Sequence, residues 1–190
     1  FAQINANANR LARLFRQHGL KAGEAVALVC SNRHEFVEVL AAAHRTGARI
    51  TPVNWHLTTD EIAYIVRDCE AKVLIGDARV GGLAAVADAC PDLALKLVVG
   101  GSVAGFQDYE TAIAKLDGTD IDDPVLGTQM MYTSGTTGRP KGVYRANPPA
   151  PQVQESGRPR AAPAAQRSQH SADHRPVGVA SSRCRPPTDL

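Results

Sequence analysis

The chain of 190 residues lacks the cysteine and histidine patterns that mark most metal and redox proteins. None of its four cysteines stands in a Cys-x-x-Cys pair, and its six histidines form neither a His-Glu-x-x-His motif nor another ligand cluster. Cys30 lies in an apolar run, while Cys69 and Cys90 lie on the apolar faces of expected helices, which predicts buried free thiols. We therefore expect no metal site and a reducing, cytoplasmic compartment.

Long apolar runs are also absent. No stretch approaches the roughly 20 apolar residues that a membrane-spanning helix needs, and no signal-like apolar segment stands at the start. The chain opens at Phe1, without methionine and already inside a helical pattern. We therefore expect it to begin within a longer protein.

Residues 145–190 contain no lysine and no aromatic residue, whereas they hold eight of the twelve prolines and seven arginines. With so few large apolar side chains, burial cannot offset chain entropy, which predicts disorder. The segment carries a net charge of +4 and residues 1–144 carry −2, so the basic balance is no sign that the folded part binds nucleic acid or a membrane. A GC-rich gene read out of frame yields such a composition, and a natural linker is the alternative. Translation of the other two reading frames distinguishes the two.

Residues 1–144 show apolar periodicity that alternates between helix and strand. Helical spacing runs from Phe1 to Phe15, and short apolar runs at 25–30, 49–53, 72–75 and 95–99 predict buried strands. Helices are expected between them, and Asp108 is a candidate cap for a short one. Strands that alternate with helices predict an α/β fold with a mainly parallel sheet and flanking helices.

Two candidate capping boxes set helix starts in this pattern. Asn32 with Glu35 precedes one apolar helical run, and Thr58 with Glu61 precedes the next. The carboxylate pair Asp122-Asp123 stands just before Pro124, and this position favours a solvated turn over a general base.

The chemistry concentrates in residues 132–142, which read Tyr-Thr-Ser-Gly-Thr-Thr-Gly-Arg-Pro-Lys-Gly after an apolar strand. Glycines let backbone N–H groups approach an anion closely, hydroxyls donate further hydrogen bonds, and Lys141 supplies a positive charge. The spacing differs from a Walker A loop, because Pro140 stands where that loop has glycine and Gly142 follows the lysine. The stretch therefore predicts a loop that wraps a polyphosphate, with a return strand beginning at 142–144.

This segment resembles the Tyr-Thr-Ser-Gly-Thr-Thr-Gly-x-Pro-Lys-Gly signature of the acyl-adenylate-forming superfamily, the AMP-dependent synthetases and ligases. Residues 23–28, 47–54 and 57–65 are similar to the first strand, second strand and following helix of these enzymes. The combination most resembles the fatty acyl-CoA synthetase branch, over residues 1 to about 144. The resemblance implies a partial N-terminal adenylation domain at 1–144, followed by a non-homologous segment at 145–190.

The resemblance also implies two half-reactions. A carboxylate, in this branch a fatty acid, attacks the α-phosphate of ATP and releases pyrophosphate, and coenzyme A then attacks the acyl-adenylate, with Mg²⁺ neutralising charge. Four hydroxyls would donate to the β- and γ-phosphates, two glycines would permit close approach, and Lys141 would act as the catalytic cation. The implied phosphate-binding residues are Thr133, Ser134, Gly135, Thr136, Thr137, Gly138 and Lys141.

Other working parts of such enzymes have no counterpart in the sequence. It lacks a Tyr-Gly-x-Thr-Glu motif for adenine and Mg²⁺, a Gly-Asp for the ribose, and a lysine-bearing C-terminal domain. We therefore expect the chain to be inactive in the full reaction, and exposed sheet edges would favour aggregation. Two alternatives are a non-catalytic nucleotide-binding or RNA-binding remnant and a fragment of an amino-acid adenylation domain.

Overall fold

The computed structural model describes residues 1–133 and 140–144. The predicted disorder of 145–190 therefore lies outside the described residues and stays a prediction. Within the described part, no helix is both long enough and apolar enough to cross a membrane.

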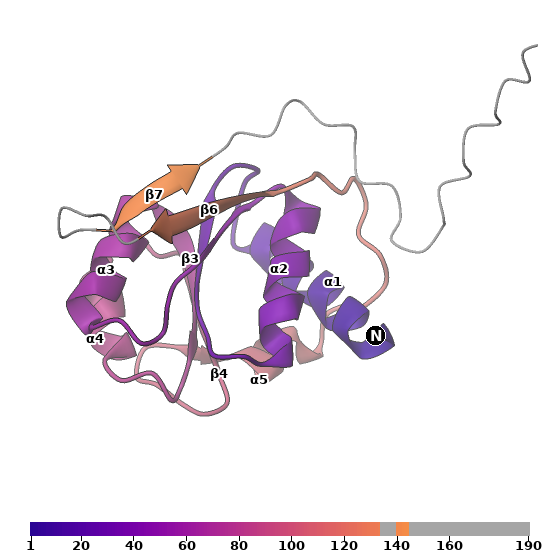
Figure 1. Cartoon of the computed structure of the whole chain (residues 1–190). Coiled ribbons are helices and arrows are strands. Elements are labelled where there is room, and N and C mark those ends of the chain that lie inside the picture. Colours follow the sequence, from indigo (N-terminus) through magenta and orange to yellow (C-terminus); the bar gives the residue numbers. More distant parts are fainter. Residues whose placement is uncertain (134–139, 145–190) are drawn as a thin grey trace, which may run out of the picture. The chain divides into compact units, whose positions relative to one another are not determined.

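The described residues form one seven-stranded sheet in the order β5-β4-β3-β1-β2-β6-β7, with helices on both faces (Figure 1). Every neighbouring pair is parallel except β6 and β7, which are antiparallel. The predicted α/β class with a mainly parallel sheet is confirmed. The elements are α1 Ala2–Gln17, β1 Ala25–Val29, α2 His34–Thr46, β2 Arg49–Pro52, α3 Thr59–Asp68, β3 Ala71–Asp77, α4 Leu83–Asp88, β4 Leu95–Val99, β5 Gln107–Asp108, α5 Tyr109–Ala114, β6 Thr128–Thr133 and β7 Lys141–Tyr144.

Strand β1 lies in the middle of the sheet and is buried along its whole length, as its uninterrupted apolar run requires. Its side chains alternate between two cores. Val26 and Leu28 pack into the cluster formed with α1, α2 and α5, whereas Ala25, Ala27 and Val29 join the cluster formed with α3 and α4. The helices therefore cover opposite faces of one sheet.

The helix caps test two of the sequence predictions. At α3 the capping box is confirmed, because the Thr58 hydroxyl accepts from the Glu61 N–H and the Glu61 carboxylate accepts from the Thr58 N–H. The box expected from Asn32 and Glu35 is wrong. Helix α2 begins at His34, with Arg33 as the N-cap residue and no side-chain capping bond. Glu35 instead accepts from the Arg33 guanidinium at 3.0 and 2.6 Å, which takes up the carboxylate that the box would need.

The segment that leads from α5 to β6 is held by backbone contacts with α1 and α2. Arg16 donates to the carbonyls of Asp122 and Asp123, whose side chains are exposed, as expected for a solvated turn. The Gly127 N–H then donates to the His44 carbonyl at 2.9 Å. A Cβ at this glycine would lie 2.4 Å from the Ala48 carbonyl oxygen, so only glycine fits the approach. These contacts bring β6 beside β2.

Candidate functional site: the hairpin that carries the signature

The described residues of the signature lie on or directly beside β6 and β7, the strands that form a hairpin at the edge of the sheet (Figure 1). Thr133 ends β6, Lys141 begins β7, and the two residues face each other in the antiparallel register. The return strand predicted at 142–144 is confirmed and begins one residue earlier. The other five predicted phosphate-binding residues lie outside the described residues: Ser134, Gly135, Thr136, Thr137 and Gly138.

The two described ends of the signature are open to solvent. Thr133 and Lys141 are exposed, and Pro140 is half-buried. Among the described residues, no carboxylate lies within 4.0 Å of the Lys141 ammonium. The register thus brings one exposed hydroxyl and one exposed ammonium group together on neighbouring strands.

Side chains on the inner face of the hairpin connect it to the body of the protein. Met130 and Tyr132 pack against the cluster beneath α3, and the Tyr132 hydroxyl donates to the Asp68 carboxylate at 2.5 Å. At the far end of the hairpin, the Arg49 guanidinium lies over the Tyr144 ring, 5.2 Å from its centroid. The hairpin therefore has a tyrosine contact on each of its strands.

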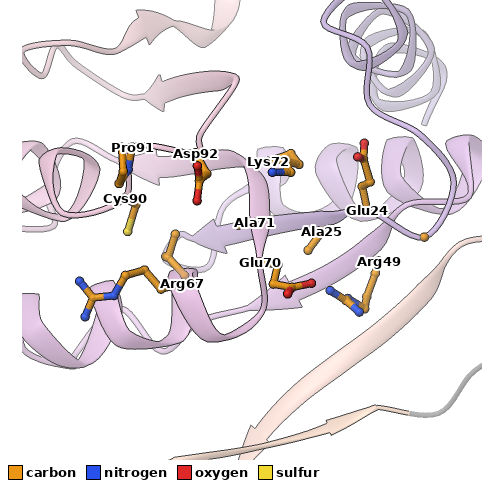
Figure 2. A pocket seen from close by; sticks show the side chains of 12 residues that line it. Glu24, Ala25, Arg49, Arg67, Glu70, Ala71, Lys72, Cys90, Pro91 and Asp92 are labelled. Carbon is orange, nitrogen blue, oxygen red and sulfur yellow. The ribbon is translucent and has the colours of Figure 1, made fainter.

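One hollow lies beside this region and another lies away from it. One of about 370 Å³ borders the exit of the loop, because Pro140 is part of its wall together with residues of α3 and with Ala89. The other, of about 630 Å³, lies at the amino ends of β1, β2 and β3, where Ala25, Arg49 and Ala71 line it (Figure 2). Strand β6 runs parallel to β2, and Thr133 is the last residue of β6. The larger hollow, at the amino ends of the strands, therefore lies at the opposite end of the strands from Thr133.

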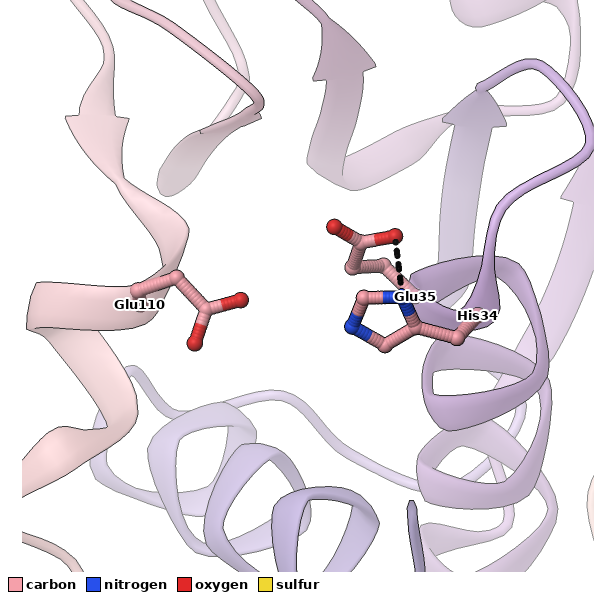
Figure 3. Close-up of side chains that lie close together, drawn as sticks. All are labelled: His34, Glu35 and Glu110. Carbon is pink, nitrogen blue, oxygen red and sulfur yellow. Dashed lines mark ion pairs between the residues drawn. The ribbon is translucent and has the colours of Figure 1, made fainter. Parts of the chain in front are cut away.

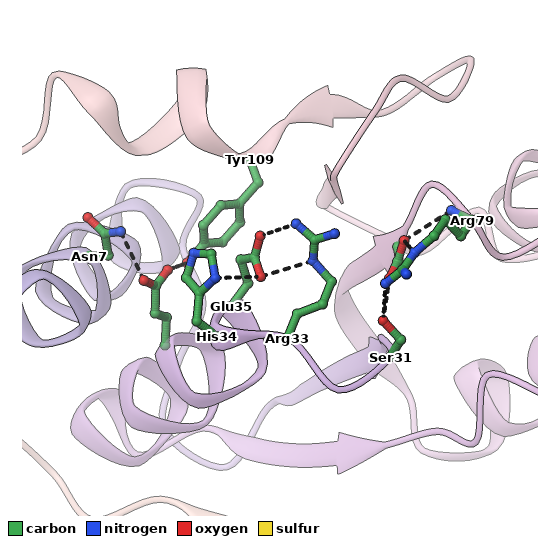
Figure 4. A network of polar contacts seen from close by, with 9 residues as sticks. Asn7, Ser31, Arg33, His34, Glu35, Arg79 and Tyr109 are labelled. Atoms are coloured by element: carbon green, nitrogen blue, oxygen red, sulfur yellow. Dashed lines mark hydrogen bonds and ion pairs between the residues drawn. The ribbon is translucent and has the colours of Figure 1, made fainter. Parts of the chain in front are cut away.

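A buried polar network that sequence reasoning missed lies at the carboxyl ends of β1 and β3 (Figure 4). Asp77 is fully buried and accepts from the Ser31 hydroxyl at 2.7 Å and from the Arg79 guanidinium at 2.8 Å. The hydrogen bonds from Arg79, aided by that from Ser31, hold the pKa of Asp77 well below its ordinary value. Asp77 follows an apolar strand like many solvent-facing aspartates, so nothing in the local sequence marks it.

The second half of the network connects α1, α2 and α5. Buried Glu38 accepts from the Tyr109 hydroxyl at 2.8 Å and from the Asn7 amide at 2.9 Å. Nearby, ligand atoms of His34, Glu35 and Glu110 lie within 4.8 Å of one another (Figure 3). Both Glu35 oxygens already accept from Arg33, so a metal ion there would compete with a guanidinium. The arrangement is therefore centred on the ion pair of Arg33 with Glu35.

The remaining sequence candidates have plain structural outcomes. Cys30, Cys69 and Cys90 are free and buried, as predicted, and burial raises the pKa of Cys30 and of Cys69 to about 11. These thiols are therefore poor nucleophiles.

Comparison with known proteins agrees with this geometry. The family model described as AMP-binding enzyme matches residues 1–147. A long-chain-fatty-acid–CoA ligase of Mycobacterium tuberculosis is 34% identical over 153 residues, covering 77% of this chain and 29% of the ligase. A fatty acid–[acyl-carrier-protein] ligase of Streptomyces coeruleorubidus is 30% identical over 148 residues, covering 77% and 28%.

Among solved structures, that of an anthranilate CoA ligase in complex with anthranoyl-AMP superposes with a TM-score of 0.69 at 28% identity. It covers 76% of this chain and 29% of the ligase. The chain thus spans less than a third of the length of each of these three ligases. It belongs to the AMP-binding, acyl-adenylate-forming enzyme family.

Proposed function

We propose that this chain supplies the phosphate-binding hairpin of an AMP-forming acyl-CoA ligase. In the whole enzyme, ATP activates a carboxylic acid as an acyl-adenylate, and a thiol then takes the acyl group. The observation that carries the proposal is the pairing of Thr133 with Lys141 at the mouth of the signature loop. That pairing places a hydroxyl, and a cation with no carboxylate partner among the described residues, on either side of the seven residues 134–140, which are rich in glycine and threonine.

The proposed roles follow from the charges of the reaction. When the carboxylate attacks the α-phosphate, negative charge develops on the departing pyrophosphate, and a positioned cation stabilises that charge. Lys141 fills this role, and Thr133 donates a hydrogen bond to a phosphate oxygen beside it. Ser134, Thr136 and Thr137 would donate similarly, with Gly135 and Gly138 allowing the backbone N–H groups to approach.

Mg²⁺ is part of the proposed reaction, but the hairpin does not fit it as a resident ion. Mg²⁺ prefers carboxylate and phosphate oxygens, and neither β6 nor β7 carries a carboxylate. We infer that the ion would arrive with the phosphates of ATP.

We propose a fatty acid as the substrate acid and coenzyme A as the thiol acceptor, although membership of the family by itself specifies neither. Fatty acid and coenzyme A are supported by the relatives that bear those names, although one relative is an acyl-carrier-protein ligase and a structural neighbour is an anthranilate ligase. We propose a partial adenylation domain at 1–144, with 145–190 outside it, and hence no complete reaction by this chain. Its buried free thiols support a cytoplasmic location.

Isothermal titration calorimetry of MgATP binding to the chain tests the proposal. Wild-type protein should bind, and Lys141→Ala should raise the Kd by about tenfold, the effect of losing one charge-assisted contact. Lys115→Ala, which removes an equally exposed lysine after α5, is the matched control and should leave the Kd unchanged. Equal binding by all three proteins would refute the assigned role of the hairpin.

ATP–pyrophosphate exchange with a panel of fatty and aromatic acids tests the second part. We expect no exchange above background from this chain, because it spans 28–29% of its relatives. Acid-dependent exchange that Lys141→Ala abolishes would show a complete adenylation site and contradict the proposal that the domain is partial.

A further inference from the structure

The hairpin that carries the signature leaves the main sheet after its second residue. Strand β6 pairs with β2 only at Thr128 and Gln129, and within the described residues the rest of β6 pairs only with β7. Backbone bonds to the sheet therefore do not fix where Thr133 and Lys141 lie. Side-chain contacts between the hairpin and the rest of the protein must do so, and the contact of Arg49 with Tyr144 lies at the end of the hairpin away from these two residues.

Tyr132 makes the most direct of these contacts. Its hydroxyl donates to Asp68 Oδ2 at 2.5 Å, across 64 residues of sequence, and Asp68 is the last residue of α3. On the other strand, Gly142 is its register partner, and a Cβ at that glycine would lie 3.1 Å from Tyr132 Cζ and 3.2 Å from its hydroxyl oxygen. The ring is therefore held between α3 and β7, one residue from each end of the loop.

The chemistry of the pair favours a persistent bond. Hydrogen bonds to a carboxylate are shorter and stronger than those between neutral groups. Partial burial, and then the hydrogen bond to Asp68, raise the pKa of Tyr132, so the phenol stays protonated and remains the donor. Asp68 also accepts from the Tyr64 hydroxyl through Oδ1, at 3.4 Å.

We propose that Asp68 is a positioning residue for Thr133 and Lys141 on the hairpin that carries the signature. Through Tyr132 it holds the hairpin at one distance from α3, and so places Thr133 and Lys141 for an incoming triphosphate. Asp68 lies outside the signature and touches no substrate. The use of this contact in nucleotide binding rests on the proposed function, whereas the contact itself can be tested separately.

Four variants separate positioning from general stability. Tyr132→Phe and Asp68→Ala each remove the bond, Asp68→Asn keeps an acceptor oxygen, and Tyr64→Phe makes the same chemical change at the same carboxylate from within α3. Two quantities are measured on each: the rate of amide hydrogen exchange in β6 and β7, and the Kd for MgATP. Thermal unfolding monitors the fold.

The proposal expects Tyr132→Phe and Asp68→Ala to speed exchange in 130–133 and 141–144, with exchange in β1 and β3 unchanged. Both should weaken MgATP binding by about five- to tenfold, which is less than the loss of a charge-assisted bond to the ligand itself would cause, because the bond to Asp68 acts only through the position of the hairpin. The double variant Tyr132→Phe/Asp68→Ala should bind MgATP no more weakly than either single variant, because both substitutions remove the same bond. Asp68→Asn and Tyr64→Phe should stay within about threefold of wild type.

Unchanged exchange in the hairpin of Tyr132→Phe would overturn the inference, and so would equal losses of affinity in Tyr132→Phe and Tyr64→Phe. A wild-type chain that binds no MgATP would refute the proposed function instead. The exchange rates of the hairpin would then still decide whether Asp68 holds it in place.

Discussion

Tyr109→Phe should destabilise this protein more than its single lost oxygen suggests. Tyr109 begins α5 and is fully buried, and its hydroxyl donates to Glu38 on α2. Glu38 is fully buried as well, and its other oxygen accepts from Asn7 on α1. The three residues therefore join the three helices that cover one face of the sheet (Figure 4).

The magnitude follows from what the substitution leaves behind. Phenylalanine keeps the ring and its packing, so almost no apolar contact is lost. One oxygen of a buried acidic side chain loses its hydrogen-bond donor, and water cannot replace it without entering the core. A hydrogen bond to a charged group contributes about 1.5–3 kcal/mol, so we expect the free energy of unfolding to fall by about 2 kcal/mol.

Urea unfolding followed by circular dichroism measures this change, with an unaltered dependence on denaturant as the sign that the native state is the same. Tyr64→Phe is the control, because it removes an exposed hydroxyl that lies 3.4 Å from Asp68, and it should cost less than about 0.5 kcal/mol. If the two variants were equally stable, Glu38 would not depend on Tyr109 and the reasoning would be refuted.

Three further predictions concern the caps, the acid side chains and the close approach beside β6. Thr58→Ala should lower the free energy of unfolding by about 1 kcal/mol, since it breaks the capping box of α3; urea midpoints measure it. Asp77 has a lowered pKa when folded, so its stabilising effect is present above its ordinary value and is lost as pH falls below about 4. Asp77→Asn should therefore show a flatter loss of thermal stability from pH 5 to pH 2 than wild type, and parallel curves would contradict this. Gly127→Ala should cost more than about 2 kcal/mol, because its Cβ would meet two carbonyl oxygens within 2.6 Å; thermal unfolding close to that of wild type would contradict it.

Much of the fold could be predicted from the sequence, because each buried strand is a short apolar run and each helix has its own periodicity. The return strand after the signature was predicted from its place after the loop and not from an apolar run, because β7 is exposed along its whole length. The capping box at Asn32 failed because a neighbouring arginine competes for the Glu35 carboxylate, and a spacing rule takes no account of that competition.

The contacts that support the candidate site were not predictable. Tyr132 and Asp68 are 64 residues apart, and they meet only because α3 packs beneath the hairpin. Asp77 and Ser31 are similarly separated and meet where two parallel strands end. Pairs of this kind depend on the strand order and on the crossing of helices over the sheet, neither of which has a local signal.

The central claim is that the hairpin at Thr133 and Lys141 holds the phosphates of ATP rather than its base. Displacement of a bound fluorescent ATP analogue by inorganic pyrophosphate and by adenosine tests it most directly. We expect pyrophosphate to displace the analogue and adenosine at the same concentration not to displace it. Lys141→Ala should weaken the effect of pyrophosphate. Displacement by adenosine alone, unaffected by Lys141→Ala, would contradict it.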